Sequence, residues 1–393
     1  MTCCIMIRVL HIMSTVTGGG VERRRLSLAK AFKGSNFQMK LVGTFKSGAI
    51  AEQIEENGVE IIEVGDFNGP FHWEKHRKIQ KIIDDFQPHI IHGAVYEGVT
   101  MAAINGFIKK VPVVIVEETS DPQNRSAKAD FLLRIFSWTA DRFIAIAPNV
   151  ADYLINTAKI DSKKVITINN GVEIPREVSS EEIKNLRNQY HITPTDFVIG
   201  TVGRLFDDHK KITDIIAAIK MVENVDNLKL LVVGSGRDEE LIKQKAIDLG
   251  VRDKVIFTGY QFDTAPFYKL MNVFCIASQR EGFGLVAAEA MLHHLPVIAT
   301  KVGGLQNVVV HDETGILIKP NQPKDIALAI NKLYNDPQLL DSFADKGFKR
   351  AMDNYTEERY VKEVEALYLE LLKQKEIKSV SYTHLTLPTK RIV

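Results

Sequence analysis

The densest group of residues suited to chemistry lies at 281–291, where two glutamates flank a glycine-containing stretch. The preceding run, 273–277, is apolar and strand-like, and the residues from Leu285 onward suit a helix. Glycines between a strand and a helix let backbone N–H groups and the helix dipole approach an anion closely. Glu281 would lie in the loop and Glu289 within the helix, where both carboxylates can accept hydrogen bonds from hydroxyls. The segment therefore predicts a site for a ligand that carries phosphate and hydroxyl groups.

The elements that must position this segment follow from the apolar pattern of the whole chain. Short β-rich runs alternate with amphipathic helical stretches, which is typical of parallel sheets with crossover helices. The first series of expected strands covers 8–13, 39–43, 60–64, 89–92, 113–117, 142–147 and 165–168. A second series covers 197–203, 229–234, 255–259, 273–277, 296–300 and 316–318. We predict an α/β protein with two tandem Rossmann-like, doubly wound domains that face a central cleft.

The length of the chain supports this division. A chain of 393 residues is too long for one ordinary core and suits two domains of about 150 to 200 residues. Asparagine, glycine and proline before residue 176 mark a linker. We predict domains at 1–173 and 174–355, followed by a helix at 356–378 that packs across both. The threonine-rich tail, 379–393, is interpreted as non-native or disordered.

The composition excludes several classes of protein. With 45% hydrophobic and 25% charged residues, the chain resembles a water-soluble globular protein. A net charge of +1 lacks the basic excess of nucleic-acid-binding proteins, so no nucleic-acid partner is expected. No apolar stretch approaches the ~20 residues that cross a bilayer. Cys3, Cys4 and Cys275 form neither a disulfide framework nor a zinc spacing. These features favour the cytoplasm.

The segment 281–291 resembles the signature of a known family, the retaining glycosyltransferases of the two-domain B fold, family 4. That signature is two glutamates separated by seven residues in the context E-G-F-G-L-V-x-x-E-A-M, which this chain matches closely. Shorter matches occur in the family's order at 18–22, Gly171, 202–205, 234–236, 257–260, 296–300 and 302–304. The resemblance covers residues 7–375. It implies transfer of a sugar from a nucleotide diphosphate sugar to an acceptor hydroxyl, with the anomeric configuration retained.

The resemblance also implies roles for particular residues. Glu281 would contact hydroxyls of the donor sugar, and Glu289 would contact the ribose of the nucleotide. Arg204 and a following lysine would neutralise the diphosphate, which is the stabilisation a departing phosphate needs. The family has that lysine where this chain has a histidine, so Lys210 is favoured and Lys211 is the alternative.

Further donor-site residues follow from the same motifs. The backbone amides of Gly19 and Gly20 would approach the diphosphate from the first domain. The other nucleotide-binding positions that the resemblance implies are Gly234, Tyr260, Phe283, Gly284 and Leu285.

The clearest departure from the family is at Glu118, where many relatives carry a histidine. A carboxylate near phosphate would be repelled, which leaves three alternatives: a raised pKa, pairing with a cation such as Arg125, or orientation toward hydroxyls of the sugar or acceptor. We favour the third alternative, because the loop at 121–126 is polar and expected to face the cleft. Glu118 is therefore included among the catalytic candidates.

Two basic stretches are less specific. The amphipathic stretch 72–83 suits an anionic membrane surface, which would place the protein at the inner face of the membrane. The alternative is a core-packed helix with a solvated face. The arginines Arg23, Arg24 and Arg25 could hold a phosphorylated acceptor or could simply lie exposed.

Rival functions can be weighed against the motifs. A nicotinamide-dependent oxidoreductase is disfavoured, because the third glycine of its fingerprint falls on Arg23 or Glu239. No Asp-x-Asp triplet occurs, so neither the metal clamp of A-type glycosyltransferases nor any other cofactor is expected. A non-catalytic nucleotide-sugar-binding protein is the remaining alternative. For an enzyme, we expect a UDP-sugar donor and a saccharide or lipid-linked acceptor, in the synthesis of cell-surface polysaccharide, lipopolysaccharide or glycolipid.

Overall fold

The structure is a computed structural model that describes residues 6–67, 69, 71–120, 125–225 and 227–375. The tail 379–393, the first two cysteines and most of the expected polar loop at 121–126 lie outside these residues. The chain forms two compact units: unit 1 comprises residues up to Glu117, Leu132–Phe143 and those from Lys362 onward, and unit 2 comprises Glu118–Phe131 and Ile144–Val361. The domain boundaries expected from the sequence stay predictions.

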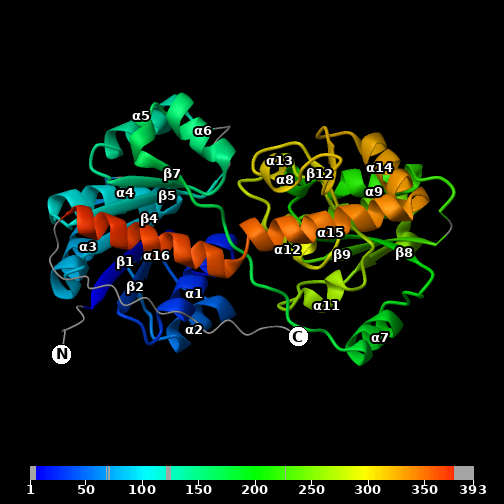
Figure 1. Cartoon of the computed structure of the whole chain (residues 1–393), viewed down its shortest axis with the longest axis horizontal. Helices are drawn as coiled ribbons and strands as arrows, with labels where there is room; N and C mark the ends of the chain where they lie inside the picture. The colour runs from blue at the N-terminus through cyan, green and yellow to red at the C-terminus, as the bar shows by residue number, and fades with distance from the viewer. Residues whose placement is uncertain (1–5, 68, 70, 121–124, 226, 376–393) are drawn as a thin grey trace. The chain divides into compact units, whose positions relative to one another are not determined.

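The first sheet, of which Figure 1 labels β1, β2, β4, β5 and β7, has the strand order β3-β2-β1-β4-β5-β6-β7. Its strands are β1 (Ile7–Ile12), β2 (Phe37–Gly43), β3 (Glu60–Glu63), β4 (Ile90–Ala94), β5 (Val113–Glu118), β6 (Arg142–Ala145) and β7 (Val165–Thr167). The pairs β1–β2, β2–β3, β1–β4 and β4–β5 are parallel. The order turns back between β1 and β4, as in doubly wound sheets.

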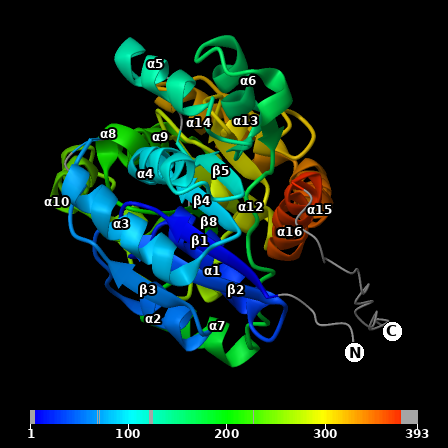
Figure 2. The same cartoon turned by 90° about the vertical axis from the view of Figure 1, so that its left-hand side faces the viewer.

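Crossover helices connect these strands. They are α1 (Gly20–Phe32), α2 (Ala49–Glu56), α3 (Trp73–Phe86), α4 (Val95–Ile108), α5 (Ala127–Phe136), α6 (Pro148–Asn156) and the short η1 (Ser162–Lys164). Figure 2 shows α3 and α4 side by side. The basic helix α3 buries His76, Ile79, Ile83 and Phe86, while most of its charged residues face solvent. Its apolar stripe is therefore used in packing, as the core-packed alternative requires.

The second sheet has the order β10-β9-β8-β11-β12-β13. Its strands are β8 (Phe197–Val202), β9 (Leu228–Val233), β10 (Val255–Phe257), β11 (Val273–Ile276), β12 (Val297–Thr300) and β13 (Gly315–Ile318). All neighbouring pairs are parallel. The central strands are buried along almost their whole length, which explains their nearly continuous apolar sequence. Here the order turns back between β8 and β11.

The helices of the second half are α7 (Ser180–Gln189), α8 (Asp207–Lys210), α9 (Ile212–Met221), α10 (Glu239–Asp248), η2 (Arg252–Lys254), α11 (Ala265–Tyr268), α12 (Leu285–Leu292), α13 (Leu305–Val308), α14 (Pro323–Asn335), α15 (Pro337–Asn354) and α16 (Glu357–Gln374). Helices α9 and α14 pack together, and their fully buried isoleucines, Ile215 and Ile330, join one core with the sheet. The two parallel sheets with their helices confirm the predicted α/β fold class.

The last helix, α16, returns to the first sheet. The hydroxyl of the buried Tyr368 lies 2.6 Å from Nδ1 of His92 in β4 and 3.3 Å from Nε2 of His11 in β1. In Figure 1 this red-orange helix crosses β1 and β4. Within the described ranges, none of the helices combines the length and the apolar character needed to cross a bilayer.

Candidate functional site

The turn in strand order between β8 and β11 brings two distant loops together. Arg204 and Lys210 follow β8, and Glu281 follows β11. The carboxyl ends of parallel strands open at one edge, and α/β sheets bind ligands where the strand order turns back. Here Nζ of Lys210 donates to Oε2 of Glu281 at 2.6 Å, and both side chains are partly exposed. The edge therefore carries an ion pair that solvent can reach.

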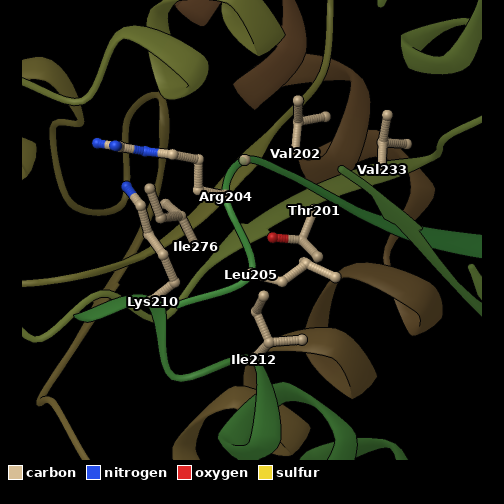
Figure 3. A pocket seen from close by; sticks show the side chains of 9 residues that line it. Thr201, Val202, Arg204, Leu205, Lys210, Ile212, Val233 and Ile276 are labelled. Atoms are coloured by element: carbon tan, nitrogen blue, oxygen red, sulfur yellow. The ribbon is translucent and has the colours of Figure 1, made fainter. Parts of the chain in front are cut away.

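Two cationic side chains line a pocket at this edge. Figure 3 shows Arg204 and Lys210 extending to the same side, with Thr201 and Ile276 among the other lining residues. The Arg204 guanidinium lies over the ring of Phe206, 5.4 Å from its centroid. Among the residues that the structure describes, Arg204 forms no ion pair, so its charge is available to an anion.

The structure separates the three basic residues at 209–211. Lys210 lines the pocket, whereas Lys211 has a left-handed backbone, with φ of 49°, and is the N-cap of α9. Burial, followed by the nearby Arg280 guanidinium, lowers the pKa of His209. At neutral pH that imidazole is therefore mostly uncharged, and Lys210 is the cation nearest the family's lysine position.

Glu281 is held by contacts between three loops. Its carbonyl oxygen accepts from the backbone N–H of Gly304, after β12, at 2.8 Å. The neighbouring Gln279 donates its backbone N–H to the carbonyl of His209, after β8, at 2.8 Å. A Cβ atom on Gly304 would lie only 2.4 Å from the carbonyl oxygen of Gly282. The glycine after β12 thus permits the close approach that places Glu281.

The motif residues between the two glutamates have separate tasks. Gly284 is the N-cap of α12, and its φ of 99° favours glycine. Leu285 begins the helix, so its backbone N–H belongs to the unpaired first turn. The ring of Phe283 is buried and packs edge-on against Tyr355, with centroids 5.4 Å apart. Any ligand contact of Phe283 must therefore use its backbone.

Glu289 lies on α12 and has a partner that the sequence did not reveal. The hydroxyl of Tyr268, at the end of α11, donates to Oε2 of Glu289 at 3.0 Å. No motif marks this tyrosine. The only sequence signal is that a tyrosine in an apolar run needs a hydrogen-bond partner for its hydroxyl.

Two other candidates lie at the same edge, after β9 and β10. Gly234 has a φ of 137°, and a Cβ atom there would lie 1.9 Å from the carbonyl oxygen of Gly203. A residue without a side chain is therefore required at this position for the loops after β8 and β9 to meet. Tyr260 follows β10 and is 68% exposed, so its ring is open to a ligand.

In unit 1, Gly19 is the N-cap of α1 and Gly20 is its first residue. The buried carboxylate of Glu22 folds back over this turn and accepts from the backbone N–H and the hydroxyl of Thr17, at 3.4 and 3.3 Å. A Cβ atom on Gly19 would lie 2.5 Å from this carboxylate. The first turn of α1 thus holds a carboxylate of its own, and contact of its amides with a diphosphate stays a prediction.

Glu118 pairs with a cation, which is the second of the three alternatives considered for this carboxylate. Its Oε2 lies 2.6 Å from the Arg125 guanidinium, and its Oε1 accepts from the Ser120 hydroxyl at 2.7 Å. The buried carboxylate thus takes the nearest cation in the structure, and the preferred orientation toward ligand hydroxyls stays a prediction. A role of Glu118 in the reaction stays a prediction.

The arginine triplet in α1 is not a surface cluster. Arg24 and Arg25 are both buried, and Arg25 pairs with Glu117 of β5 at 2.5 Å. A phosphorylated acceptor therefore cannot reach Arg24 or Arg25, and neither is simply exposed. Both expectations for these two side chains were wrong, because the sequence does not show that β5 supplies a buried carboxylate beneath α1.

No group of three His, Cys, Asp or Glu side chains within the described ranges is arranged to hold a metal ion. Cys275 is a free, buried thiol in β11, and burial raises its pKa. The cationic side chains that line the pocket are Arg204 and Lys210.

Two sequence families match the chain in succession. Glycosyltransferase Family 4 matches residues 18–176, and Glycosyl transferases group 1 matches residues 182–350. The capsular polysaccharide biosynthesis glycosyltransferase CapM of Staphylococcus aureus is 34% identical over 248 residues, which are 62% of this chain and 65% of that protein. The chain spans less than two thirds of the length of this and other curated relatives.

Solved structures share the fold. A glycosyltransferase of Rickettsia africae has a TM-score of 0.84 and 19% identity, covering 93% of this chain and 99% of that one. HepE of Anabaena, in complex with UDP, has a TM-score of 0.83 and 20% identity, covering 93% and 100%. At such identities the likeness concerns the fold alone.

Proposed function

We infer the reaction from one premise: this chain belongs to the glycosyltransferases, with consecutive matches to family 4 and group 1. We propose that it transfers a sugar from a nucleotide diphosphate sugar to an acceptor hydroxyl. The observation that carries this proposal is the convergence of Arg204, Lys210 and Glu281 at one edge of the second sheet. Two cations suit a diphosphate, and a carboxylate suits the hydroxyls of a sugar.

The same residues suggest how transfer proceeds. Negative charge grows on the diphosphate as its bond to the anomeric carbon breaks, and Arg204 and Lys210 would stabilise that charge without a metal. Glu281, once released from Lys210, would accept hydrogen bonds from hydroxyls of the donor sugar. We propose retention of configuration: the acceptor oxygen attacks from the face that the phosphate leaves, and the phosphate takes the acceptor's proton.

The substrates are proposed by analogy with named relatives. HepE of Anabaena was solved with UDP and with UDP-glucose, and CapM of Staphylococcus aureus is named for capsular polysaccharide biosynthesis. We therefore propose a UDP-sugar donor and a saccharide acceptor in the synthesis of a cell-surface polysaccharide.

The test begins with donor binding. Thermal shifts with UDP-, GDP- and ADP-sugars should identify one donor, because a ligand at about a hundred times its Kd adds roughly 2.7 kcal/mol to stability. Release of nucleoside diphosphate, with and without saccharide acceptors, then separates an enzyme from a non-catalytic binding protein. NMR of the product should show the donor's anomeric configuration. If a donor binds but no nucleoside diphosphate is released with any acceptor, the chain is a non-catalytic binding protein. A product whose anomeric configuration is inverted relative to the donor would contradict the proposed mechanism.

A further inference from the structure

Tyr268 is a buried residue with a hydrogen bond to a predicted ligand-binding side chain. It ends α11 and is 1% exposed. Its hydroxyl donates to Oε2 of Glu289 at 3.0 Å and lies 3.4 Å from the carbonyl oxygen of Val286. Both contacts are to α12, the helix that follows the glycine loop. The hydroxyl therefore joins α11 to the one carboxylate on that helix.

The ring of Tyr268 is fixed by aromatic neighbours. His293 stacks on it with centroids 4.6 Å apart and planes 20° apart, and Phe274 of β11 lies 5.8 Å away. Burial, followed by the nearby Lys269 charge, lowers the pKa of His293 to about 4. His293 is therefore neutral at pH 7 and brings no charge to the carboxylate. A rigid ring with a fixed hydroxyl is suited to hold a flexible partner.

Glu289 forms no ion pair within the described residues, and its side chain is partly exposed. Tyr268 contacts one carboxylate oxygen and leaves the other free to accept. A glutamate on a helix loses rotamer freedom when it binds a ligand, at a cost that a pre-existing hydrogen bond reduces.

We propose that Tyr268 is a positioning residue for nucleotide binding: its hydroxyl holds Glu289 in the orientation that accepts the ribose hydroxyls. This inference rests on the proposed function, because it takes Glu289 as the ribose contact. Tyr268 touches no ligand itself. Its effect should appear only with nucleotides that carry the ribose hydroxyls.

The test measures the affinities of UDP, GDP and ADP and of their 2′,3′-dideoxy counterparts by calorimetry, using the base that binds most tightly. Tyr268→Phe should weaken ribonucleotide binding by about two- to tenfold, the cost of immobilising one flexible side chain that the hydrogen bond no longer holds. Binding of the dideoxynucleotide should stay unchanged. The preference for the ribonucleotide should therefore shrink. Equal weakening of both ligands, or no change in either, would overturn the proposal.

Two further variants complete the design. Tyr355→Phe removes another buried hydroxyl of unit 2, which donates to the carbonyl of Asn307 at 3.0 Å, and it should keep the full ribose preference. Glu289→Gln should lose most of that preference. If Glu289→Gln keeps it, the ribose role within the proposed function is wrong. If Glu289→Gln loses the ribose preference and Tyr268→Phe keeps it, the ribose role of Glu289 stands and only the positioning role of Tyr268 is wrong.

Discussion

At Lys210, the charge that a diphosphate would need is already engaged by Glu281, 2.6 Å away. A nucleoside diphosphate must therefore compete with this carboxylate for the ammonium group. A nucleotide sugar meets less opposition, because its hydroxyls can satisfy the carboxylate that the phosphate displaces. The pair should thus weaken binding of the product relative to the donor.

The first prediction follows from this competition. Glu281→Gln should tighten UDP binding by about two- to fivefold, the range of a partly exposed ion pair, while lowering transfer by at least about a hundredfold. Calorimetry with UDP and a transfer assay measure the two effects. Glu289→Gln, which leaves the ion pair intact, should not tighten UDP binding. Weaker UDP binding in Glu281→Gln would contradict the competition.

The second prediction concerns Arg204. Arg204→Ala should slow transfer by a factor of about a hundred to a thousand, as removal of a donor to developing charge generally does. Arg237→Ala is a matched control, because that guanidinium also lies over Phe206, 4.9 Å from the ring centroid, but pairs with Asp208. The control should stay within about twofold of the unmodified rate. If Arg204→Ala transfers sugar as fast as Arg237→Ala, Arg204 does not stabilise the transition state.

At the scale of elements, the loops after β11 and β12 meet through glycine. Gly304 packs against the carbonyl of Gly282 and donates its N–H to the carbonyl of Glu281. A Cβ atom on Gly304 would also lie 2.5 Å from Cα of Phe283, so the two loops are in direct backbone contact here. The position of Glu281 thus depends on a residue that carries no side chain.

The third prediction is that Gly304→Ala shifts the Glu281 loop. Overpacking of this kind costs about 1 to 3 kcal/mol, and we expect lower thermal stability together with reduced donor affinity. Gly347→Ala is the control: it lies inside α15, where a Cβ atom would meet its nearest neighbour at 3.5 Å. That variant should bind donor normally. Donor affinity in Gly304→Ala equal to that of the control would show that the loop tolerates the displacement.

At the scale of the whole molecule, the absence of an Asp-x-Asp triplet and the two cations at the pocket lead to the fourth prediction. Transfer should continue in excess EDTA, because Arg204 and Lys210 offset the diphosphate charge. The measurement is the transfer rate after chelation and after readdition of Mg²⁺ or Mn²⁺. Loss of activity that either metal restores would contradict this charge compensation.

The fifth prediction concerns stability against pH. Burial lowers the pKa of His11 and of His92, and the nearby Arg25 charge acts in the same direction on both. Burial opposes charging of Glu117 as well, but the Arg25 guanidinium and the His92 imidazole together outweigh it and lower the pKa of Glu117 to about 2. For all three groups the unfolded chain binds protons more readily than the folded one. Stability is therefore lost as pH falls, first below 6.5 through the histidines and then below 4.5 through Glu117.

We expect the thermal midpoint to fall by several degrees between pH 7 and pH 5, where the histidines act. His11→Leu, which cannot take up a proton, should lose less over the same interval. A midpoint that stays level or rises on acidification would show that the buried histidines accept protons without cost.

The sequence alone determined the strands and the main helices of both sheets. Their apolar runs are local patterns, and β8 and β11 begin where those patterns predict. It also marked Glu281 and Arg204, because these residues stand in short motifs that can be compared one by one. Such features need no knowledge of how distant segments pair.

Only the tertiary structure decided which charged groups meet. The strand order, which hydropathy does not encode, lets Lys210 pair with Glu281 and Arg25 pair with Glu117. Tyr268 could not be assigned to Glu289 from the sequence, because its partner depends on how α11 packs against α12. Buried polar groups must find partners, but a one-dimensional pattern does not say which residue supplies them. These contacts span many residues of chain, and the fold brings them together.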